Sequence, residues 1–221
     1  MSATIAALQQ TRIAAGVCGV LGPLLLVVYF ATPFFTNWPF QGGTPEQIAS
    51  FASSHATLFY VGAWLQTIGT LLSVVFFVAM VTSTRTAAQT SGVMVIVGSA
   101  ALLALVLVEA GLMVDVPLAA AAGNKEAAST TFGLVNGVFT RVFPLVPASV
   151  PYLGLGAVIL SSPIIDRRFG LAAIALGALF QLAGVVALFS SAGVIAVGSL
   201  AAIQAVWVMT AAIAFSRSTA G

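Results

Sequence analysis

Charged residues are scarce in this chain of 221 residues, with five acidic and seven basic side chains that together make up 5% of the sequence. A soluble domain carries about 25% charged residues, so this composition excludes an ordinary water-soluble protein. Seven basic residues are also too few to form a nucleic-acid-binding surface. We therefore expect no nucleic-acid partner.

Metal ligands are equally scarce. Cys18 is the only cysteine and His55 the only histidine, which excludes an internal disulfide and argues against a haem or zinc site. The sequence contains no phosphate-binding loop, nucleophile motif or aspartate-rich metal motif. We therefore expect neither a metal ion nor a cofactor.

Apolar residues, in contrast, make up 60% of the chain. They occur in runs of about 20 residues, the length that a helix needs to cross about 30 Å of hydrocarbon. The shorter alternating segments of a membrane β-barrel are absent. The sequence predicts an all-α integral membrane bundle, with one transmembrane helical domain over 1–221. The six predicted spans are 13–30, 56–81, 93–117, 131–160, 169–189 and 194–215.

Basic residues indicate how the six spans are oriented. Under this span count, one side of the membrane receives Arg12, Arg85, Arg167, Arg168 and Arg217. Only Lys125 lies in a loop on the opposite side. The positive-inside rule then predicts a multi-pass protein of the cell membrane, here a bacterial inner membrane, with both termini in the cytoplasm.

Two other features predict local structure. Thr44, followed by a proline and two polar residues, is typical of a helix start, so we expect a short interfacial helix in the first outer loop. The fourth span contains Pro144, Pro147 and Pro151, which predict kinks or local unwinding. Because freed backbone groups in a membrane must be satisfied by protein or by a water-lined cavity, this span favours a nearby pocket.

Glu109 is the residue around which the candidate site is organised. It lies inside the third span, and an acid at bilayer depth is costly unless it is paired, protonated or hydrated, so it marks a functional site by default. Counting 1.5 Å per residue places Arg141 of the fourth span at a similar depth, so we expect the two side chains to pair or to share a cavity away from lipid. Asp115 is a further acid on the same span, close to its outer end.

The same count brings other side chains to a similar level. Gln66, Gln181 and Gln204 are each the only glutamine in their span and fall near the midplane. Aromatic residues close to them in the sequence are candidates for the walls of a substrate cavity, and an aromatic outer loop is a candidate lid. The wall candidates are Trp64, Phe139, Phe143, Phe180 and Trp207, and the lid candidate is Trp38.

Purely structural interpretations remain open. A buried Glu109–Arg141 pair can serve only to fix which helices meet, and single glutamines often bond across a helix interface without another role. Asp115 is close enough to the outer interface to be simply solvated. Most membrane aromatics face acyl chains or pack helices rather than form a cage.

Two resemblances bear on function. The layout, with a basic residue before an Ala/Gly-rich first span and a long outer loop, resembles uncharacterised six-span membrane proteins common in Ala-rich bacterial proteomes. The chain size, the absence of a DDxxD-type motif and an intramembrane acid among aromatics resemble small membrane-embedded terpene cyclases. The second resemblance implies that a carboxylic acid protonates an alkene or epoxide to start cyclisation.

Three functions are compatible with these features. The first is an enzyme that cyclises a lipophilic, prenylated substrate with Glu109 as the acid. Arg141 must then pair elsewhere, with Asp115 or a substrate phosphate, because an adjacent arginine would hold the acid ionised. The second is a substrate-binding or transport subunit with the outer loop as its lid. The third is a structural protein without a site. Expected partners are a lipophilic small molecule and membrane lipids, and a homo-oligomer or a membrane partner subunit is compatible with the sequence.

Overall fold

Short polar segments separate the helices, and several of their residues cap the start of the helix that follows. Asn124, Asp166 and Ser190 each accept a hydrogen bond from a backbone N–H of the helix that follows, which satisfies a donor that a helix start leaves free.

The computed structural model describes residues 2–39 and 43–218, and within these ranges it contains helices and connecting turns but no strand.

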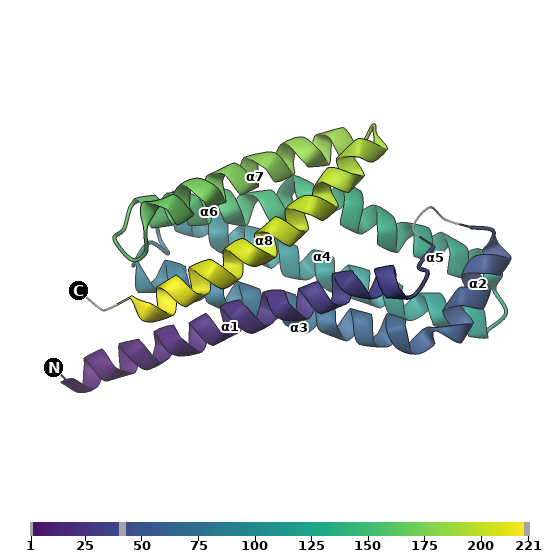
Figure 1. The fold of residues 1–221 in the computed structure, drawn as a ribbon, viewed down its shortest axis with the longest axis horizontal. Coiled ribbons are helices and arrows are strands. Elements are labelled where there is room, and N and C mark those ends of the chain that lie inside the picture. The colour runs from purple at the N-terminus through teal and green to yellow at the C-terminus, as the bar shows by residue number, and fades with distance from the viewer. Residues whose placement is uncertain (1, 40–42, 219–221) are drawn as a thin grey trace.

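The helices follow one another along the chain as Figure 1 shows. They are α1 (Ser2–Phe35), α2 (Pro45–Ser54), α3 (Ala56–Ser83), α4 (Thr90–Ala121), α5 (Lys125–Gly137), the π-helical turns η1 (Val138–Val142) and η2 (Pro144–Ala148), α6 (Ser149–Leu160), α7 (Arg167–Ala187) and α8 (Ser191–Arg217). With the segment from α5 to α6 counted as one, six helices are long and apolar enough to cross a membrane. The predicted all-α class with six long apolar helices is therefore confirmed.

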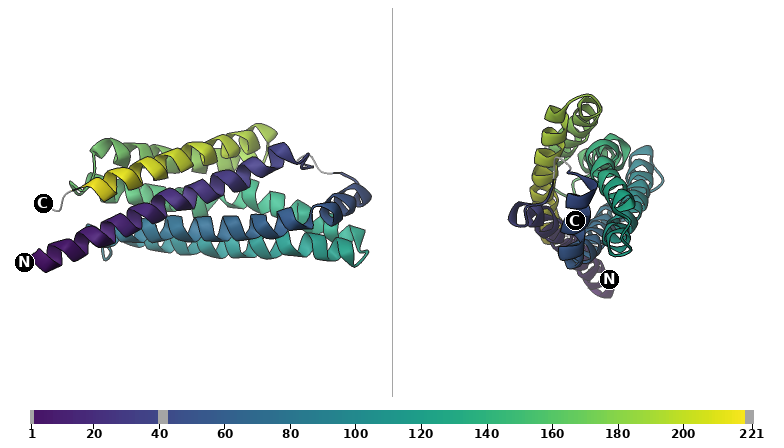
Figure 2. Two further views of the ribbon diagram at one scale, coloured as in Figure 1. Left: turned by 60° about the horizontal axis from the view of Figure 1, so that its bottom comes forward. Right: turned by 90° about the vertical axis from the view of Figure 1, so that its right-hand side faces the viewer.

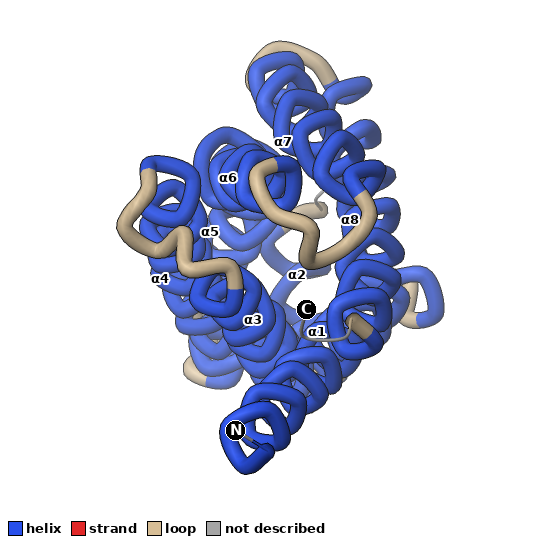
Figure 3. The backbone as a smooth tube through the Cα atoms, turned by 90° about the vertical axis from the view of Figure 1, so that its left-hand side faces the viewer, coloured by secondary structure: helices blue, strands red, loops and turns tan. Residues whose placement is uncertain are grey.

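The six long helices form a closed ring in the order α1, α3, α4, α6, α7 and α8, with α8 packed against α1 (Figure 3). Large side chains fill the middle of the ring, among them Phe77, Tyr152 and Phe180. Glycines allow neighbouring helices to approach closely. A Cβ atom added at Gly22 of α1, for example, would lie 2.6 Å from the carbonyl oxygen of Gly69 in α3.

The two ends of the bundle differ. The start of α1 and the end of α8 lie at one end, which we call the terminus end, and α2 lies at the opposite end, which we call the α2 end (Figures 1 and 2). Arg85 lies in the turn between α3 and α4, and Arg167 and Arg168 begin α7, so these arginines are at the terminus end. Lys125 begins α5 at the α2 end. The predicted separation of basic residues between the two ends is therefore present.

Two helices extend beyond their predicted ends by about one turn or more, α1 by five residues and α4 by four. Pro117 was expected to end the third span, but α4 continues through it to Ala121. A proline removes only one backbone donor, and membrane helices tolerate that loss where neighbouring groups compensate for it. α1 likewise continues past Phe30 to Phe35. Both extensions lie toward the α2 end, where they change which side chains meet.

The fourth span is locally unwound, as its prolines predicted. In the two π-helical turns, Phe143 N donates to Val138 O (3.0 Å) and Ala148 N to Phe143 O (2.9 Å), each a bond between residues i and i+5. Pro144 and Pro147 lie in the second turn and have no N–H to donate. Beyond it, the Ser149 hydroxyl donates to Gln181 Oε1 of α7 (3.0 Å). The span therefore remains helical but has a wider turn in its middle.

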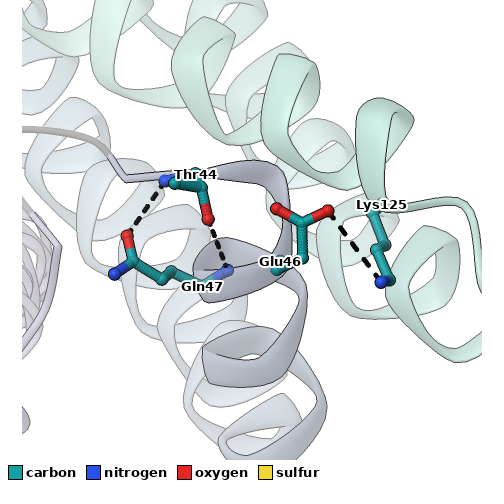
Figure 4. Close-up of polar contacts among 4 residues, drawn as sticks. All are labelled: Thr44, Glu46, Gln47 and Lys125. Carbon is teal, nitrogen blue, oxygen red and sulfur yellow. Dashed lines mark hydrogen bonds and ion pairs between the residues drawn. The ribbon is translucent and has the colours of Figure 1, made fainter.

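The short helix predicted after Thr44 is present as α2. Thr44 Oγ1 accepts from Gln47 N (3.4 Å), and Gln47 Oε1 accepts from Thr44 N (3.0 Å), which together form a capping box (Figure 4). α2 buries Ile48 and Ala52 in a cluster shared with α3, α4 and α5. α2 therefore closes the α2 end of the bundle.

Removing the cap should loosen α2. We expect Thr44→Ala to destabilise this helix by about 1 kcal/mol, because the backbone N–H of Gln47 loses the hydroxyl oxygen that caps it. Hydrogen exchange of the α2 amides, followed by mass spectrometry, measures the effect. Thr82→Ala is the matched control, since the exposed Thr82 hydroxyl bonds only to carbonyls of its own helix. Equal protection of α2 in wild type and Thr44→Ala would contradict the assignment.

Glu46 makes the stability of α2 dependent on pH. A backbone hydrogen bond in the first helical turn, then the Thr44 hydroxyl and the Lys125 ammonium, hold the pKa of Glu46 below its ordinary value. Lys125 Nζ lies 3.9 Å from Glu46 Oε1 (Figure 4). A lowered pKa in the folded state means that the ionised group stabilises α2 above its ordinary pKa, and this contribution is lost as the pH falls through the lowered value.

The fluorescence of Trp38 can report the loss of α2 stability at low pH, because the Trp38 ring centroid lies 5.6 Å from that of Phe51 in α2. We expect Trp38 fluorescence to change on acidification in the wild type and to change less in Glu46→Gln, which has no carboxylate to protonate. Identical acid titrations of the two proteins would show that Glu46 does not stabilise α2.

Candidate functional site

Glu109 lies in α4, past its midpoint toward the α2 end, and is only 2% exposed. Two polar side chains from other helices approach its carboxyl group. Gln66 of α3 lies within hydrogen-bonding reach of this carboxyl group, and Tyr29 of α1 lies close enough to interact with it electrostatically. The Tyr29 hydroxyl donates a hydrogen bond to Met113 Sδ, 3.3 Å away and one turn beyond Glu109 on α4. Three helices therefore contribute to one buried polar site.

Gly62 explains why these helices can converge. A Cβ atom added at Gly62 would lie 2.9 Å from Met113 Cε and 3.2 Å from Tyr29 Cε2. A larger residue there would require the end of the Met113 side chain and the Tyr29 ring to shift. The absence of a side chain at Gly62 therefore leaves room for Tyr29 and Met113 beside α3.

Two oxygen atoms of the site have no hydrogen-bond partner within the described residues. They are Glu109 Oε1 and Gln66 Oε1, and both are buried. A buried polar atom without a partner costs about 1–3 kcal/mol, so such atoms in a folded protein call for an explanation such as a bound molecule or a catalytic role. A carboxyl group with one free oxygen can donate or accept one proton or hydrogen bond there.

Arg141 does not pair with Glu109, contrary to the sequence-based expectation. Its side chain is exposed on η1, whereas Glu109 is buried, and the described residues contain no ion pair between the two. Counting 1.5 Å per residue along ideal α-helices gave a similar depth for Glu109 and Arg141, but this count took no account of the π-helical turns. Because a π turn holds more residues than an α turn, it rotates the following side chains away from their expected direction.

This arrangement predicts which residues are energetically coupled. In a double-mutant cycle, the stability losses of Glu109→Gln and Arg141→Gln should add within about 0.5 kcal/mol, since the side chains share no partner. Glu109→Leu and Gln66→Leu should instead show coupling of about 0.6 kcal/mol or more, as for polar contacts between membrane helices. Unfolding of the purified protein in mixed detergent measures all four single variants and both double variants. A coupling energy between Glu109 and Arg141 that is larger than the coupling energy between Glu109 and Gln66 would refute this geometry.

Asp115 lies apart from the site. It is exposed on α4, and its Oδ2 accepts a hydrogen bond from Thr131 Oγ1 of α5 (3.2 Å). It thus links two neighbouring helices near the α2 end. The structure favours the solvated, structural interpretation of Asp115 over a catalytic one.

The three glutamines do not share one site. Gln66 lies beside Glu109, whereas Gln181 is exposed and accepts from Ser149. Gln204 of α8 is half-buried, and its Oε1 has no partner within the described residues. Of the three, only Gln66 is therefore a candidate site residue next to the acid.

Some of the aromatic candidates lie near the Glu109 site and others lie elsewhere. Phe139 and Phe143 belong to a continuous series of rings that starts at Tyr29. The ring centroids are 4.9 Å apart for Tyr29–Phe30 and Phe30–Phe139, 5.5 Å for Phe139–Phe143 and 5.7 Å for Phe143–Phe180. An aromatic path therefore leads from the neighbourhood of Glu109 into the middle of the bundle.

Trp64, Trp207 and Trp38 lie elsewhere. Trp64 is 58% exposed, because it precedes Gln66 by two positions and so points to the opposite side of α3. Trp207 Nε1 donates to Phe169 O (3.1 Å), which fixes α8 to the start of α7 at the terminus end. Trp38 packs against aromatic rings of α2, α3 and α5 under the cover that α2 provides. Trp64 and Trp207 are therefore not walls of the Glu109 site, and Trp38 lies at its α2 end.

The sequence did not identify Tyr29 or Met113. The first span was expected to end at Phe30, which would have placed Tyr29 at the membrane surface. Because α1 continues to Phe35, Tyr29 instead lies beside Gly62 and Met113 inside the bundle. No sequence signal marked this continuation, because Thr32 and Pro33 follow Phe30 within three residues.

Comparisons with protein-family models, with curated proteins and with solved structures gave no match. Within the described residues, no group of three His, Cys, Asp or Glu side chains is placed to hold a metal ion. The geometry around Glu109 is therefore the basis for inferring function.

Proposed function

We propose that this protein is a multi-pass enzyme of the cell membrane that cyclises a lipophilic, prenylated substrate with Glu109 as the initiating acid, as in membrane-embedded terpene cyclases. The termini and the arginines of the terminus end face the cytoplasm, and α2 lies at the outer interface. The observation that carries the proposal is the buried Glu109 carboxyl, which has no cation in contact within the described residues and one oxygen without a partner.

The surroundings of Glu109 suit proton donation. Apolar burial without a neighbouring cation favours the neutral carboxylic acid, and Arg141 is turned away from it. The acid gives its proton to a terminal alkene carbon, or to an epoxide oxygen, and becomes a carboxylate while a carbocation forms on the substrate. Gln66 and Tyr29 are the polar groups near the resulting carboxylate. In the alkene case, ring closure moves the cation, and loss of a proton from an adjacent carbon restores the acid.

Aromatic faces support the cationic intermediates. The rings of Tyr29, Phe30, Phe139 and Phe143 follow one another at 4.9 to 5.5 Å from the neighbourhood of Glu109. The negative face of such a ring attracts a positive charge within about 6 Å. The π-helical turns beside Phe139 and Phe143 favour a cavity on this side, because unwound backbone in a membrane needs protein or a cavity to satisfy it.

The experiment is to incubate the purified protein with a panel of linear prenylated substrates in H2O and in D2O, and to analyse the extracts by mass spectrometry. Cyclisation started on an alkene should give a product that has the mass of the substrate in H2O and one additional non-exchangeable deuterium in D2O. Product without deuterium from an alkene substrate would rule out an acid start. Recovery of all substrates unchanged would remove the enzyme proposal.

A substrate-binding subunit of an uptake system is the second candidate, and the position of α2 favours it. α2 buries Ile48 and Ala52 against the cluster that contains Met113, so it closes the α2 end directly above the Glu109 site. A binding protein would use this helix as a lid. A lipophilic ligand that co-purifies and is released chemically unchanged would support this function over catalysis, and a protein with neither ligand nor product would favour a structural role.

A further inference from the structure

A groove open to the outside runs between α1 and α8 near the terminus end. It is lined by Gly16, Val17, Val20 and Leu21 of α1 and by Ile213 and Ser216 of α8. The helices touch at its floor, since a Cβ atom added at Gly16 would lie 2.7 Å from Ser216 Cβ. Val17, Leu21 and Ile213 are 51%, 45% and 40% exposed, so its walls face the surroundings rather than the bundle interior. The groove is therefore an apolar surface that lipid chains can reach.

Positive charge lies at the end of this groove nearest the chain termini. Arg12, one turn before Gly16, donates from Nη1 to the carbonyl oxygen of Ser218 (3.1 Å), and its guanidinium lies 5.9 Å from the centre of the Phe215 ring. Arg217 follows the lining residue Ser216 and is exposed. The adjoining segments 9–21 and 211–218 contain no acidic residue, and the described residues show no ion pair for either arginine. Two cationic groups therefore remain available to an anion.

We propose that this groove binds an anionic phospholipid, with one acyl chain along the apolar walls and the phosphate at Arg12 and Arg217. An acyl chain matches the apolar lining, and arginine is well suited to phosphate because it presents several N–H donors in a planar fork. The two parts of the groove are arranged as in a lipid, with charge at the membrane surface and hydrocarbon toward the bilayer centre. The charge complementarity distinguishes an anionic lipid from a zwitterionic one and from a second copy of this chain.

Native mass spectrometry of the full chain tests the proposal. The protein is equilibrated with phosphatidylglycerol or with phosphatidylcholine of identical acyl chains, and the retained lipid is counted. We expect phosphatidylglycerol to be retained more, by about fivefold for each arginine that engages the phosphate. Arg217→Gln should lower the preference for phosphatidylglycerol over phosphatidylcholine by about fivefold.

Filling the groove should act on both lipids. Val20→Trp occupies the space between the helices and should lower retention of both, whereas Val27→Trp, at a position of α1 that is 41% exposed and outside the groove, should not. The proposal is overturned if both lipids are retained equally by the wild type, or if Val20→Trp retains as much phosphatidylglycerol as Val27→Trp. A dimer without bound lipid that Val20→Trp dissociates would also overturn it.

Discussion

The Glu109→Gln variant is expected to lose cyclised product by at least about hundredfold, the usual lower range for removing a general acid. Glutamine has nearly the size of glutamic acid and keeps a polar group beside Gln66, but it has no acidic proton to give. The fold should therefore be retained while the initiating step is lost. Product formed per mole of purified, correctly folded protein is the measurement.

Asp115→Asn is the matched control for this loss. It makes the same change of a carboxyl group to an amide on the same helix, at an exposed side chain bonded to Thr131. We expect its product yield to stay within about twofold of wild type, since exposed groups away from a site change little. If Asp115→Asn loses product and Glu109→Gln keeps it, the acid has been assigned to the wrong carboxylate.

The sequence was sufficient to predict the helices because their signals are local. Runs of apolar residues long enough to span a bilayer mark the six long helices, and the polar breaks between them contain residues that cap the start of the following helix. Thr44 with Pro45 predicted α2 for the same reason, since a cap residue and a proline at the first helical position are adjacent in the sequence. The prolines of the fourth span predicted unwinding because each removes a backbone donor at its own position.

The site was only partly predictable because it depends on direction as well as depth. Counting residues along a span gave the depth of Glu109 and Gln66, and those two do meet. It could not give the direction of Arg141, because two π-helical turns rotate that part of the span. The outward direction of Trp64, in contrast, follows from its spacing of two residues from Gln66, and assigning both residues by proximity in the sequence overlooked this.

The second large effect is expected from Gly22→Leu, which should destabilise the fold by about 3 kcal/mol, at the upper end of the usual range for overpacking. A Cβ atom at this position would lie 2.6 Å from Gly69 O, 2.6 Å from Ser73 Oγ and 2.8 Å from Ser73 N. Two of these atoms belong to the backbone of α3, so they cannot turn aside as a flexible side chain can. The helices must separate instead.

Gly133→Leu is the control for this substitution, because a Cβ atom at Gly133 would meet no atom within 4 Å. There the higher helix propensity of leucine should leave stability unchanged or raise it by up to about 1 kcal/mol. Unfolding in mixed detergent measures both variants. Because Tyr29 lies on α1 two turns beyond Gly22, separation of α1 from α3 should also withdraw its hydroxyl from Met113. Gly22→Leu should therefore alter the Glu109 site as well as the stability, and equal stability of the two glycine variants would show that α1 and α3 do not pack at Gly22 and Gly69.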